Sequence, residues 1–396
     1  MDWALESRFT DQRAGKERCL DNYRSLISEA IAATGLSDFG PDTFREGLET
    51  LVHALNSEAR LNAVGEYVLR ERILGHLKQR LQIEDWYKRH PDIDDEQIIE
   101  PLIGIGLPRT GSTALSFLLA KDPAARYLSR GEAANPCPPP SMVQGNHREL
   151  FKDEAESVQG WKSHVPSGEL APAECQDLMA LEFTSQLFLA FAQIPTYAEW
   201  LNNADLTACY AYERRCLKLL QWRMPTQPWR LKAPTHLLYL KYLDKAFPDA
   251  RFVMTHRDPT DVMLSVIDVY ADIISKFTDH LDMAYVADLN IGMWSEGMRR
   301  TLAFRDEHAN NKRFFDIHFK TMQEDPVGQV RRLHSWLNQS VSEEFANGMQ
   351  QWWVENAASR EPVTAKRPRD YAVDLDQVRP QFSDYTNRVA GWTGRQ

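Results

Sequence analysis

Hydrophobic residues along this 396-residue chain follow two different periods. In residues 1–95 they recur at helical spacing: Leu69, Ile73, Leu77 and Leu81 repeat every four residues, with arginine and lysine between them. We expect an ordinary packing face there, with a lid over a substrate or a dimer surface as alternatives. From residue 96 short apolar runs alternate with amphipathic segments. We therefore divide the chain into a helical N-terminal region (1–95), a core (96–340) and a tail (341–396).

The core predicts strands and helices in alternation. Predicted strands cover residues 98–106, 229–233, 251–255 and 313–319. Predicted helices cover residues 110–119, 261–269 and 325–337, together with an apolar helix over 178–191. Residues 279–304 mix polar and apolar positions and can cover a cleft. Apolar strands separated by helices favour a parallel sheet with both faces covered. The predicted fold class is α/β, a phosphate-loop-type three-layer fold, and the tail from Arg360 is predicted to be extended and irregular.

The segment from Ile103 to Leu115 predicts a strand, a tight glycine turn and the start of a helix. Residues 106–113 fit the phosphate-loop pattern G-x-x-x-x-G-K-[ST], except that Ser112 replaces the lysine. Free N–H groups at a helix start bind anions, and Ser112 and Thr113 add hydroxyl donors. The missing lysine argues against ATP or GTP. Arg109 supplies a cation within the turn, so the loop suits a nucleotide that is not a triphosphate.

A second predicted strand also ends in a cation. Arg257 follows the apolar run at 251–255, and Ser265 lies eight residues further on, about two helical turns away. Both can meet at a second phosphate, which suits a nucleotide with phosphate on its 5′ and 3′ sides. Arg109, Lys232 and Arg257 all fall at carboxyl ends of predicted strands, where ligands of parallel sheets collect. We expect Arg109 and Arg257 to hold opposite ends of this nucleotide.

Charge and composition narrow the function classes. A net charge of −10 disfavours general nucleic-acid binding. No apolar run is long enough to span a bilayer and the N-terminus lacks a signal-peptide pattern, so we expect a cytoplasmic protein. The five cysteines lack the spacing of zinc ligands, which predicts reduced thiols and no metal site.

Three motifs, in this order along the chain, resemble those of sulfotransferases. Residues 108–113 are similar to the 5′-phosphosulfate loop, and Arg257 with Ser265 resembles the 3′-phosphate motif. Residues 231–237, followed by 247–250, look like the segment that joins these sites in bacterial members. The resemblance implies transfer of a sulfonate group from 3′-phosphoadenosine 5′-phosphosulfate (PAPS) to a hydroxyl acceptor, with adenosine 3′,5′-bisphosphate as product and no metal required.

The resemblance also implies which residues bind the donor. The first loop and the 3′-phosphate motif would supply Arg109, Thr110, Gly111, Ser112, Thr113, Ala114, Arg257 and Ser265. Sulfotransferases often close a late basic segment over the 3′-phosphate, and here that segment would supply Arg367, Arg369 and Tyr371. A solvated turn is the alternative for this segment, and the spacing does not choose between the two arginines. On this basis we expect the tail to close over the nucleotide.

The catalytic groups are expected to be one cation and one base. Lys232 is the candidate cation, the task that the family gives to its central lysine. Glu132 is the first candidate base, because tyrosylprotein and heparan sulfotransferases carry a glutamate in a similar place. His164 and His236 are the other candidate bases. His164 lies in a segment similar to the histidine segment of cytosolic sulfotransferases, but about seventy residues from where the resemblance needs it. His236 follows Lys232 closely.

Several questions stay open at this level. A phenol, sterol, aliphatic alcohol, lipid or sugar hydroxyl all fit the acceptor, which we expect to be a small molecule. The alternatives to a sulfotransferase are a phosphate-loop kinase or nucleotidase, and a nucleotide-binding protein without turnover. The kinase would need a loop lysine, which is absent, and a magnesium-binding aspartate, which is not evident. Oligomeric state is not predicted.

Overall fold

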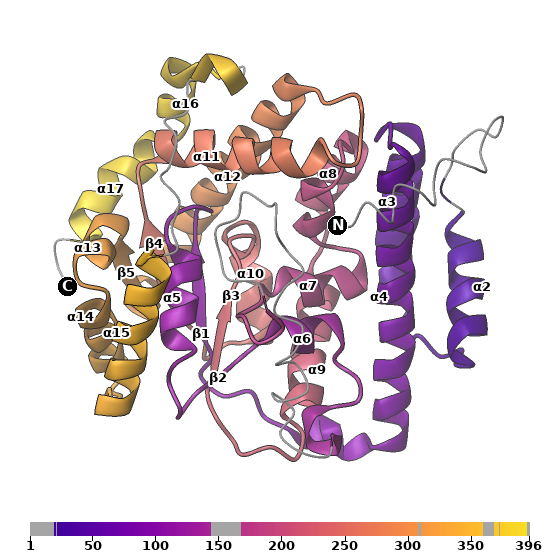
Figure 1. Cartoon of the computed structure of the whole chain (residues 1–396), viewed down its shortest axis with the longest axis horizontal. Helices are drawn as coiled ribbons and strands as arrows, with labels where there is room; N and C mark the ends of the chain where they lie inside the picture. Colours follow the sequence, from indigo (N-terminus) through magenta and orange to yellow (C-terminus); the bar gives the residue numbers. More distant parts are fainter. Residues whose placement is uncertain are drawn as a thin grey trace.

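A five-stranded parallel sheet forms the centre of the computed structural model (Figure 1). The structure describes residues 20, 22–143, 168–307, 310–358, 368–371 and 373–393. The strands are β1 (Leu102–Gly106), β2 (Arg126–Tyr127), β3 (Trp229–Lys232), β4 (Arg251–His256) and β5 (Phe314–His318). Their order in the sheet is β2-β3-β1-β4-β5, and every neighbouring pair is parallel. The α/β fold class is therefore confirmed.

Helices cover both faces of the sheet. The helices at the start and middle of the chain are α2 (Tyr23–Thr34), α3 (Phe44–Ser57), α4 (Ala63–Arg89), α5 (Ser112–Leu119), α6 (Arg130–Ala134), α7 (Gln176–Met179), α8 (Pro195–Asn203), α9 (Thr207–Gln221) and α10 (His236–Ala246). The later helices are α11 (Pro259–Ile274), α12 (Met283–Asp306), α13 (Phe319–Glu324), α14 (Pro326–Trp336), α15 (Glu343–Ala358), α16 (Leu375–Gln381) and α17 (Ser383–Thr393). Short 3-10 helices include η4 (Ala180–Glu182), η5 (Gln186–Ala190) and η7 (Pro368–Tyr371).

The two faces of the sheet belong to two apolar clusters. Leu102, Val253 and Phe315 pack with α5, α14 and α15 on one face. Ile103 and Ile105 point to the other face, where α10 packs against β1 and α17 against β5. Neighbouring residues of β1 thus serve opposite faces, as expected for a strand buried on both sides. This gives the predicted three layers.

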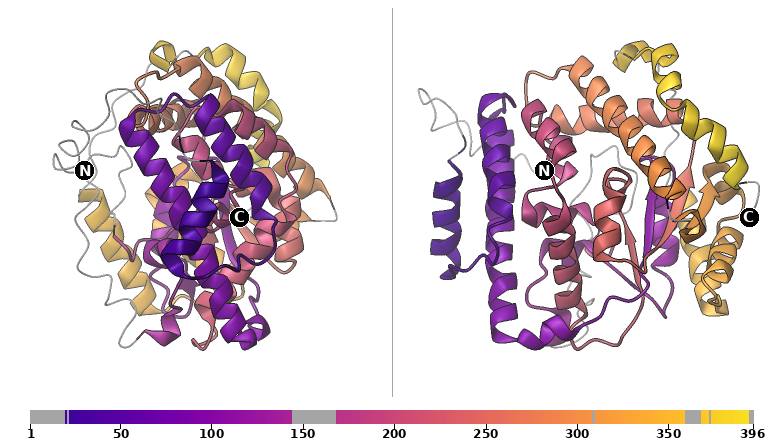
Figure 2. Two further views of the ribbon diagram at one scale, coloured as in Figure 1. Left: turned by 90° about the vertical axis from the view of Figure 1, so that its right-hand side faces the viewer. Right: turned by 180° about the vertical axis from the view of Figure 1, so that it is seen from behind.

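The N-terminal helices add to the same core. Figure 2 shows α2 and α4 on one side of the molecule and the C-terminal helices α16 and α17 on the other. Leu69, Ile73, Leu77 and Leu81 are fully buried on α4, so the predicted packing face is confirmed. No helix among the described residues is long and apolar enough to cross a membrane.

Arg80 lies between these leucines in the sequence, but it does not face solvent. Its side chain is fully buried, and its guanidinium group forms an ion pair of 2.6 Å with buried Glu182. It also donates to the carbonyl oxygens of Phe39, Pro41 and Leu181. Arg80 therefore joins α4 to the centre of the chain.

Two secondary-structure predictions are wrong. Residues 178–191 form the end of α7 and two 3-10 helices rather than one helix, because Phe183 adopts a left-handed conformation (φ 51°) that ends the helical path. The tail is not irregular where it is described, since α16 and α17 bury Val378, Phe382 and Tyr385. The strand predicted from residue 98 begins only at Leu102, after the left-handed Glu100 (φ 42°). Strand β2 was not predicted, because two residues are too few to show an apolar run.

Candidate active site

The loop between β1 and α5 is held in a strained, compact turn at the centre of the sheet. Gly106 (φ 134°) lies so close to β4 that a Cβ atom there would be 2.5 Å from the carbonyl oxygen of Thr255. Gly111 (φ 89°) directly precedes α5. The buried Thr110 hydroxyl donates to Leu107 O (2.6 Å) and lies 2.6 Å from the Thr255 hydroxyl. The loop is thus fixed between β1 and β4.

The first turn of α5 contains Ser112, Thr113 and Ala114, and no described side chain caps it. Its free N–H groups therefore point out of the turn, as in helix starts that bind anions. The loop and these residues lie at the carboxyl end of β1. In the sheet order β1 separates β3 from β4, so the loop is at the point where chain connections diverge to either side.

Two arginines lie side by side next to this loop. Arg109 Nε donates to the hydroxyl of Ser265 on α11 (3.1 Å), and an Arg257 N–H donates to Arg109 O (3.3 Å). Burial lowers the pKa of Arg109, and the neighbouring Arg257 lowers it further. The acid paired with Arg257 is Asp261, at 3.5 Å and with a side chain 61% exposed. Asp268 opposes the pKa shift at Arg109. Two guanidinium groups and a hydroxyl thus lie close together beside Asp261 and Asp268, and such a set of donors fits a phosphate.

This arrangement corrects one expectation. Arg109 and Arg257 do not point to opposite ends of a ligand, because the Arg109 side chain turns towards Ser265 and α11. The left-handed backbone at Arg109 (φ 64°) directs it there. The free N–H groups at the start of α5, with the hydroxyls of Ser112 and Thr113, form a second set of donors for an anion.

Lys232 connects this loop to a carboxylate that the sequence did not indicate. Lys232 is 5% exposed, and its Nζ donates to Glu174 Oε1 (2.5 Å) and Thr113 Oγ1 (3.3 Å). Glu174 itself is 28% exposed at its side chain. The backbone N–H of Cys175 donates to Lys232 O (3.0 Å), which aligns residue 174 beside the lysine. A cation, a partly exposed base and the anion-binding loop thus meet in one place.

Comparison with known proteins identifies this architecture. Residues 101–343, more than half of the chain, match the sulfotransferase family.

The chain belongs to the sulfotransferase family.

Two crystal structures of sulfotransferases resemble it over nearly its whole length. STF1 from Mycobacterium tuberculosis H37Rv is 28% identical, with a TM-score of 0.82 over 93% of this chain and 100% of that one. STF9 from Mycobacterium avium is 26% identical, with a TM-score of 0.82 over 95% and 98%. Among curated proteins, the omega-hydroxy-beta-dihydromenaquinone-9 sulfotransferase Stf3 of Mycobacterium bovis is 28% identical over 133 residues. That alignment spans only a third of either chain (32% and 33%).

The family implies PAPS as donor, and the residues in this sulfotransferase fit it. PAPS carries a phosphate on its 3′ side and a phosphosulfate on its 5′ side. The cluster of Arg109, Arg257 and Ser265 matches the first, and the loop with its uncapped helix start matches the second. Donor binding at these residues stays a prediction.

Glu132 is placed differently from what the sequence suggested. It is 8% exposed, and its Oε2 accepts from the Ser129 backbone N–H and hydroxyl (both 3.0 Å) in a capping box that begins α6. Its Oε1 accepts from Arg126 (2.7 Å). Because both carboxylate oxygens hold local structure, these contacts argue against Glu132 as the base. The Ser-x-x-Glu spacing at 129–132 is itself a capping-box signal.

His236 is also removed from the reacting groups. It is fully buried, the Tyr210 hydroxyl lies 2.9 Å from its Nδ1, and burial lowers its pKa to about 3. A histidine so enclosed does not reach an acceptor, which argues against the predicted role. His164 lies outside the described residues.

Of the three predicted tail residues, Tyr371 contacts α11. The Tyr371 hydroxyl donates to Asp268 Oδ1 (3.0 Å) on α11, one helical turn from Ser265. The Arg369 side chain is 76% exposed and lies 3.9 Å from Asp370, so it does not face the phosphate cluster. Arg367 lies outside the described residues.

One more acid, Asp177, lies near the pair of Lys232 and Glu174. Burial raises its pKa to about 6, and the neighbouring Glu174 carboxylate adds to this. Arg72, Arg130 and Lys232 oppose the shift. Asp177 therefore releases its proton at a higher pH than a free aspartate does.

Proposed function

We propose that this protein transfers the sulfonate group of PAPS to the hydroxyl of a small apolar molecule, with Glu174 as general base and Lys232 as the stabilising cation. One observation carries the proposal: Lys232 Nζ lies 2.5 Å from Glu174 and 3.3 Å from Thr113 at the start of α5. The lysine therefore stands between the 5′ anion site and a carboxylate. Family membership supports the reaction class.

Each end of the donor would be held by its own group of residues. Arg109, Arg257 and Ser265 would hold the 3′-phosphate, and the loop N–H groups with Ser112 and Thr113 the 5′-phosphosulfate. Tyr371 supports a tail that closes beside α11, because it is hydrogen-bonded one turn from Ser265. When bound, PAPS supplies a sulfonate group already activated by its link to phosphate.

The chain's own residues account for proton and charge movement. Glu174 takes the proton of the acceptor hydroxyl as the new oxygen–sulfur bond forms. The bond from sulfur to the 5′-phosphate oxygen breaks, and the Lys232 ammonium group stabilises the negative charge that develops on that oxygen. In the free protein the two side chains neutralise each other, so the acceptor must enter beside an existing ion pair.

The acceptor class rests on a groove and on one relative. A mostly apolar groove of about 200 Å³ lies between α8, α10 and α12, lined by residues that include Leu189, Leu238, Leu289 and Met293. Contacts lead from it to the site: Gln186 Nε2 donates to Met293 Sδ (2.9 Å) and to the Tyr270 hydroxyl (3.3 Å). Burial raises the pKa of Tyr270, and the nearby Glu174 raises it further.

A hydroxylated lipid-like molecule fits this groove. The name of the mycobacterial relative describes transfer to a hydroxylated menaquinone, which is an acceptor of this class. We propose the class only, because the aligned part covers a third of that relative.

A pair of glutamine variants tests the assignment of the base. Sulfate transfer from labelled PAPS would be measured with a panel of apolar alcohols and phenols. Glu174→Gln keeps the shape but removes the basic oxygen, so kcat should fall by roughly 10²–10⁴ with donor affinity retained.

Glu132→Gln is the matched control at the site favoured by sequence. It should weaken the ion pair with Arg126 and lower stability, while the rate per folded molecule changes little. A normal rate in Glu174→Gln together with a large loss in Glu132→Gln would return the role to Glu132.

A further inference from the structure

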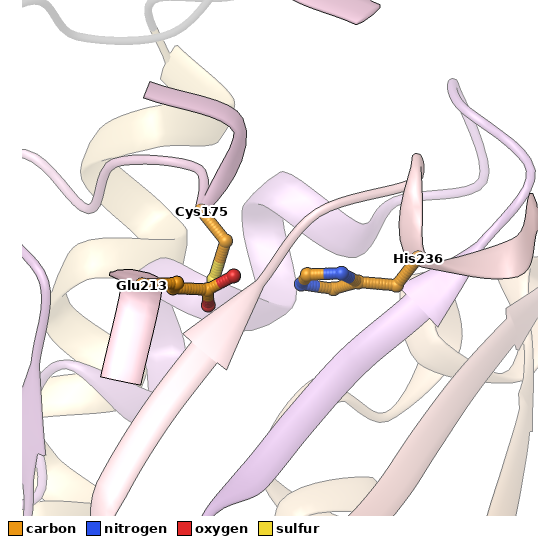
Figure 3. A group of neighbouring side chains, drawn as sticks. All are labelled: Cys175, Glu213 and His236. Atoms are coloured by element: carbon orange, nitrogen blue, oxygen red, sulfur yellow. The ribbon is translucent and has the colours of Figure 1, made fainter. Parts of the chain in front are cut away.

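Three side chains with metal-binding atoms meet in the core behind the catalytic pair (Figure 3). They are Cys175, directly before α7, Glu213 on α9, and His236, the first residue of α10. One sulfur, one carboxylate oxygen and one ring nitrogen all lie within 4.8 Å of one another. Figure 3 shows the three side chains pointing towards a common centre, and each is at most 1% exposed.

The polar atoms at this centre lack partners. Among the described residues, neither carboxylate oxygen of Glu213 nor Nε2 of His236 has a hydrogen-bond partner of acceptable geometry. Burial raises the pKa of the Glu213 carboxyl to about 8, and the nearby Cys175 thiol opposes this shift. An unpaired carboxylate buried in a protein is costly, so the centre must hold either a proton or a cation.

The surroundings of His236 favour a cation. The Tyr210 hydroxyl lies 2.9 Å from Nδ1 and can either accept a proton from Nδ1 or donate to it; in the first case Nε2 carries no proton. Nε2 then presents its lone pair to Cys175 and Glu213. This is the arrangement of metal-binding histidines, in which a hydrogen bond at one nitrogen fixes the ring and leaves the other free for the metal.

The alternative, a proton shared between Glu213 and His236, would require a direct hydrogen bond. No such bond is formed, although the atoms are neighbours. Ligand atoms around a metal ion are separated by the ion and need no mutual hydrogen bonds. A thiolate, a carboxylate and an imidazole are a donor set typical of Zn²⁺, and the two negative ligands balance its charge.

We propose that Cys175, Glu213 and His236 bind one zinc ion that holds the catalytic pair in position. Cys175 follows Glu174 in the chain, and its N–H donates to the carbonyl of Lys232. His236 lies four residues after Lys232. An ion that ties these residues to α9 would fix the spacing of Glu174 and Lys232 without taking part in the reaction. The sequence gave no sign of this site, because its ligands are far apart along the chain.

Metal content of the whole protein tests the proposal. Protein purified from zinc-supplemented medium should contain about one zinc per chain by plasma mass spectrometry. Cys175→Ser and His236→Asn should lower this to below about 0.1 per chain. Cys209→Ser is the matched control, since Cys209 is a buried cysteine of α9 whose sulfur faces backbone carbonyls instead. It should keep the zinc.

Measurements on the unmutated protein test the proposal even if the ligand variants do not fold. Removing the metal with a chelator should lower Tm, and Co²⁺ should restore it and give cobalt–thiolate charge-transfer absorption. Wild-type protein without zinc and without a cobalt spectrum would overturn the proposal, as would zinc retained by both ligand variants. None of these measurements depends on sulfate transfer. The zinc site can therefore be refuted or supported independently of the proposed function.

Discussion

Arg257 and Arg109 show how individual side chains prepare a place for an anion. The two positively charged side chains lie close together, and Arg109 is hydrogen-bonded to the Ser265 hydroxyl of α11. Replacing Arg257 with alanine should weaken binding of adenosine 3′,5′-bisphosphate by about 1.5–3 kcal/mol, because charge-assisted hydrogen bonds are lost. Isothermal titration calorimetry would measure this, with Arg45→Ala as control, since Arg45 is a surface residue paired to Asp42. Equal affinity in the two variants would contradict the assignment.

Asp177 gives a pH-dependent prediction at the same scale. Its pKa is raised to about 6 in the folded protein, against about 3.9 for a free aspartate. The unfolded chain therefore loses this proton first, so its contribution to stability falls as pH rises from about 4 to 6 and stays unfavourable above that. Asp177→Asn removes the effect and should raise Tm at pH 8 by about 1–3 °C, with little change at pH 4.

Differential scanning calorimetry at both pH values would measure this effect. Asp288→Asn, an exposed residue on α12, is the control and should leave Tm nearly unchanged. A lower Tm for Asp177→Asn at pH 8 would mean that the charge of Asp177 is stabilised by its arginine neighbours instead.

At the scale of elements, α4 depends on one buried ion pair. Removing one partner leaves the other charged and desolvated, so Arg80→Met should lower the free energy of unfolding by about 3–5 kcal/mol. Arg70→Met, also on α4, breaks a partly exposed ion pair with Glu29 of α2 and should cost less than about 1 kcal/mol. Urea unfolding would compare them. Adding Glu182→Leu to Arg80→Met should recover part of the loss, and no recovery would contradict this account of α4.

The elements also show what sequence could and could not predict. Strands bounded by turns were predicted correctly. The phosphate-loop spacing and the pair of Arg257 and Ser265 each predicted one anion site, and ligand binding at both stays a prediction. The apolar run at 178–191 carries no period that distinguishes one helix from short turns, and its path is decided by the left-handed Phe183. Glu174 was missed because its place beside Lys232 depends on a backbone hydrogen bond between distant segments. Glu132 was favoured because tyrosylprotein and heparan sulfotransferases carry a glutamate in a similar place. A glutamate three residues after a serine can equally cap a helix, and that is its role here.

For the whole molecule, the groove between α8, α10 and α12 is the proposed route to the site. A Cβ atom at Gly292, which lines this groove, would meet nothing within 4 Å, so Gly292→Phe would fill it without a clash at the backbone. KM for an apolar acceptor should rise about tenfold, equivalent to roughly 1.4 kcal/mol. Gly75→Phe on α4 is the control, because Gly75 also has open space but lies outside the groove. An unchanged KM in Gly292→Phe would place the acceptor elsewhere.

The donor is the central claim, and thermal unfolding in the presence of nucleotides tests it most directly. Adenosine 3′,5′-bisphosphate at 100 times its Kd should stabilise the protein by about 2.7 kcal/mol. ATP with Mg²⁺ should leave the Tm nearly unchanged, because the loop has Ser112 where triphosphate-binding loops have lysine. Stabilisation by the bisphosphate but not by ATP with Mg²⁺ is the predicted result. Stabilisation by ATP with Mg²⁺ alone would contradict the account.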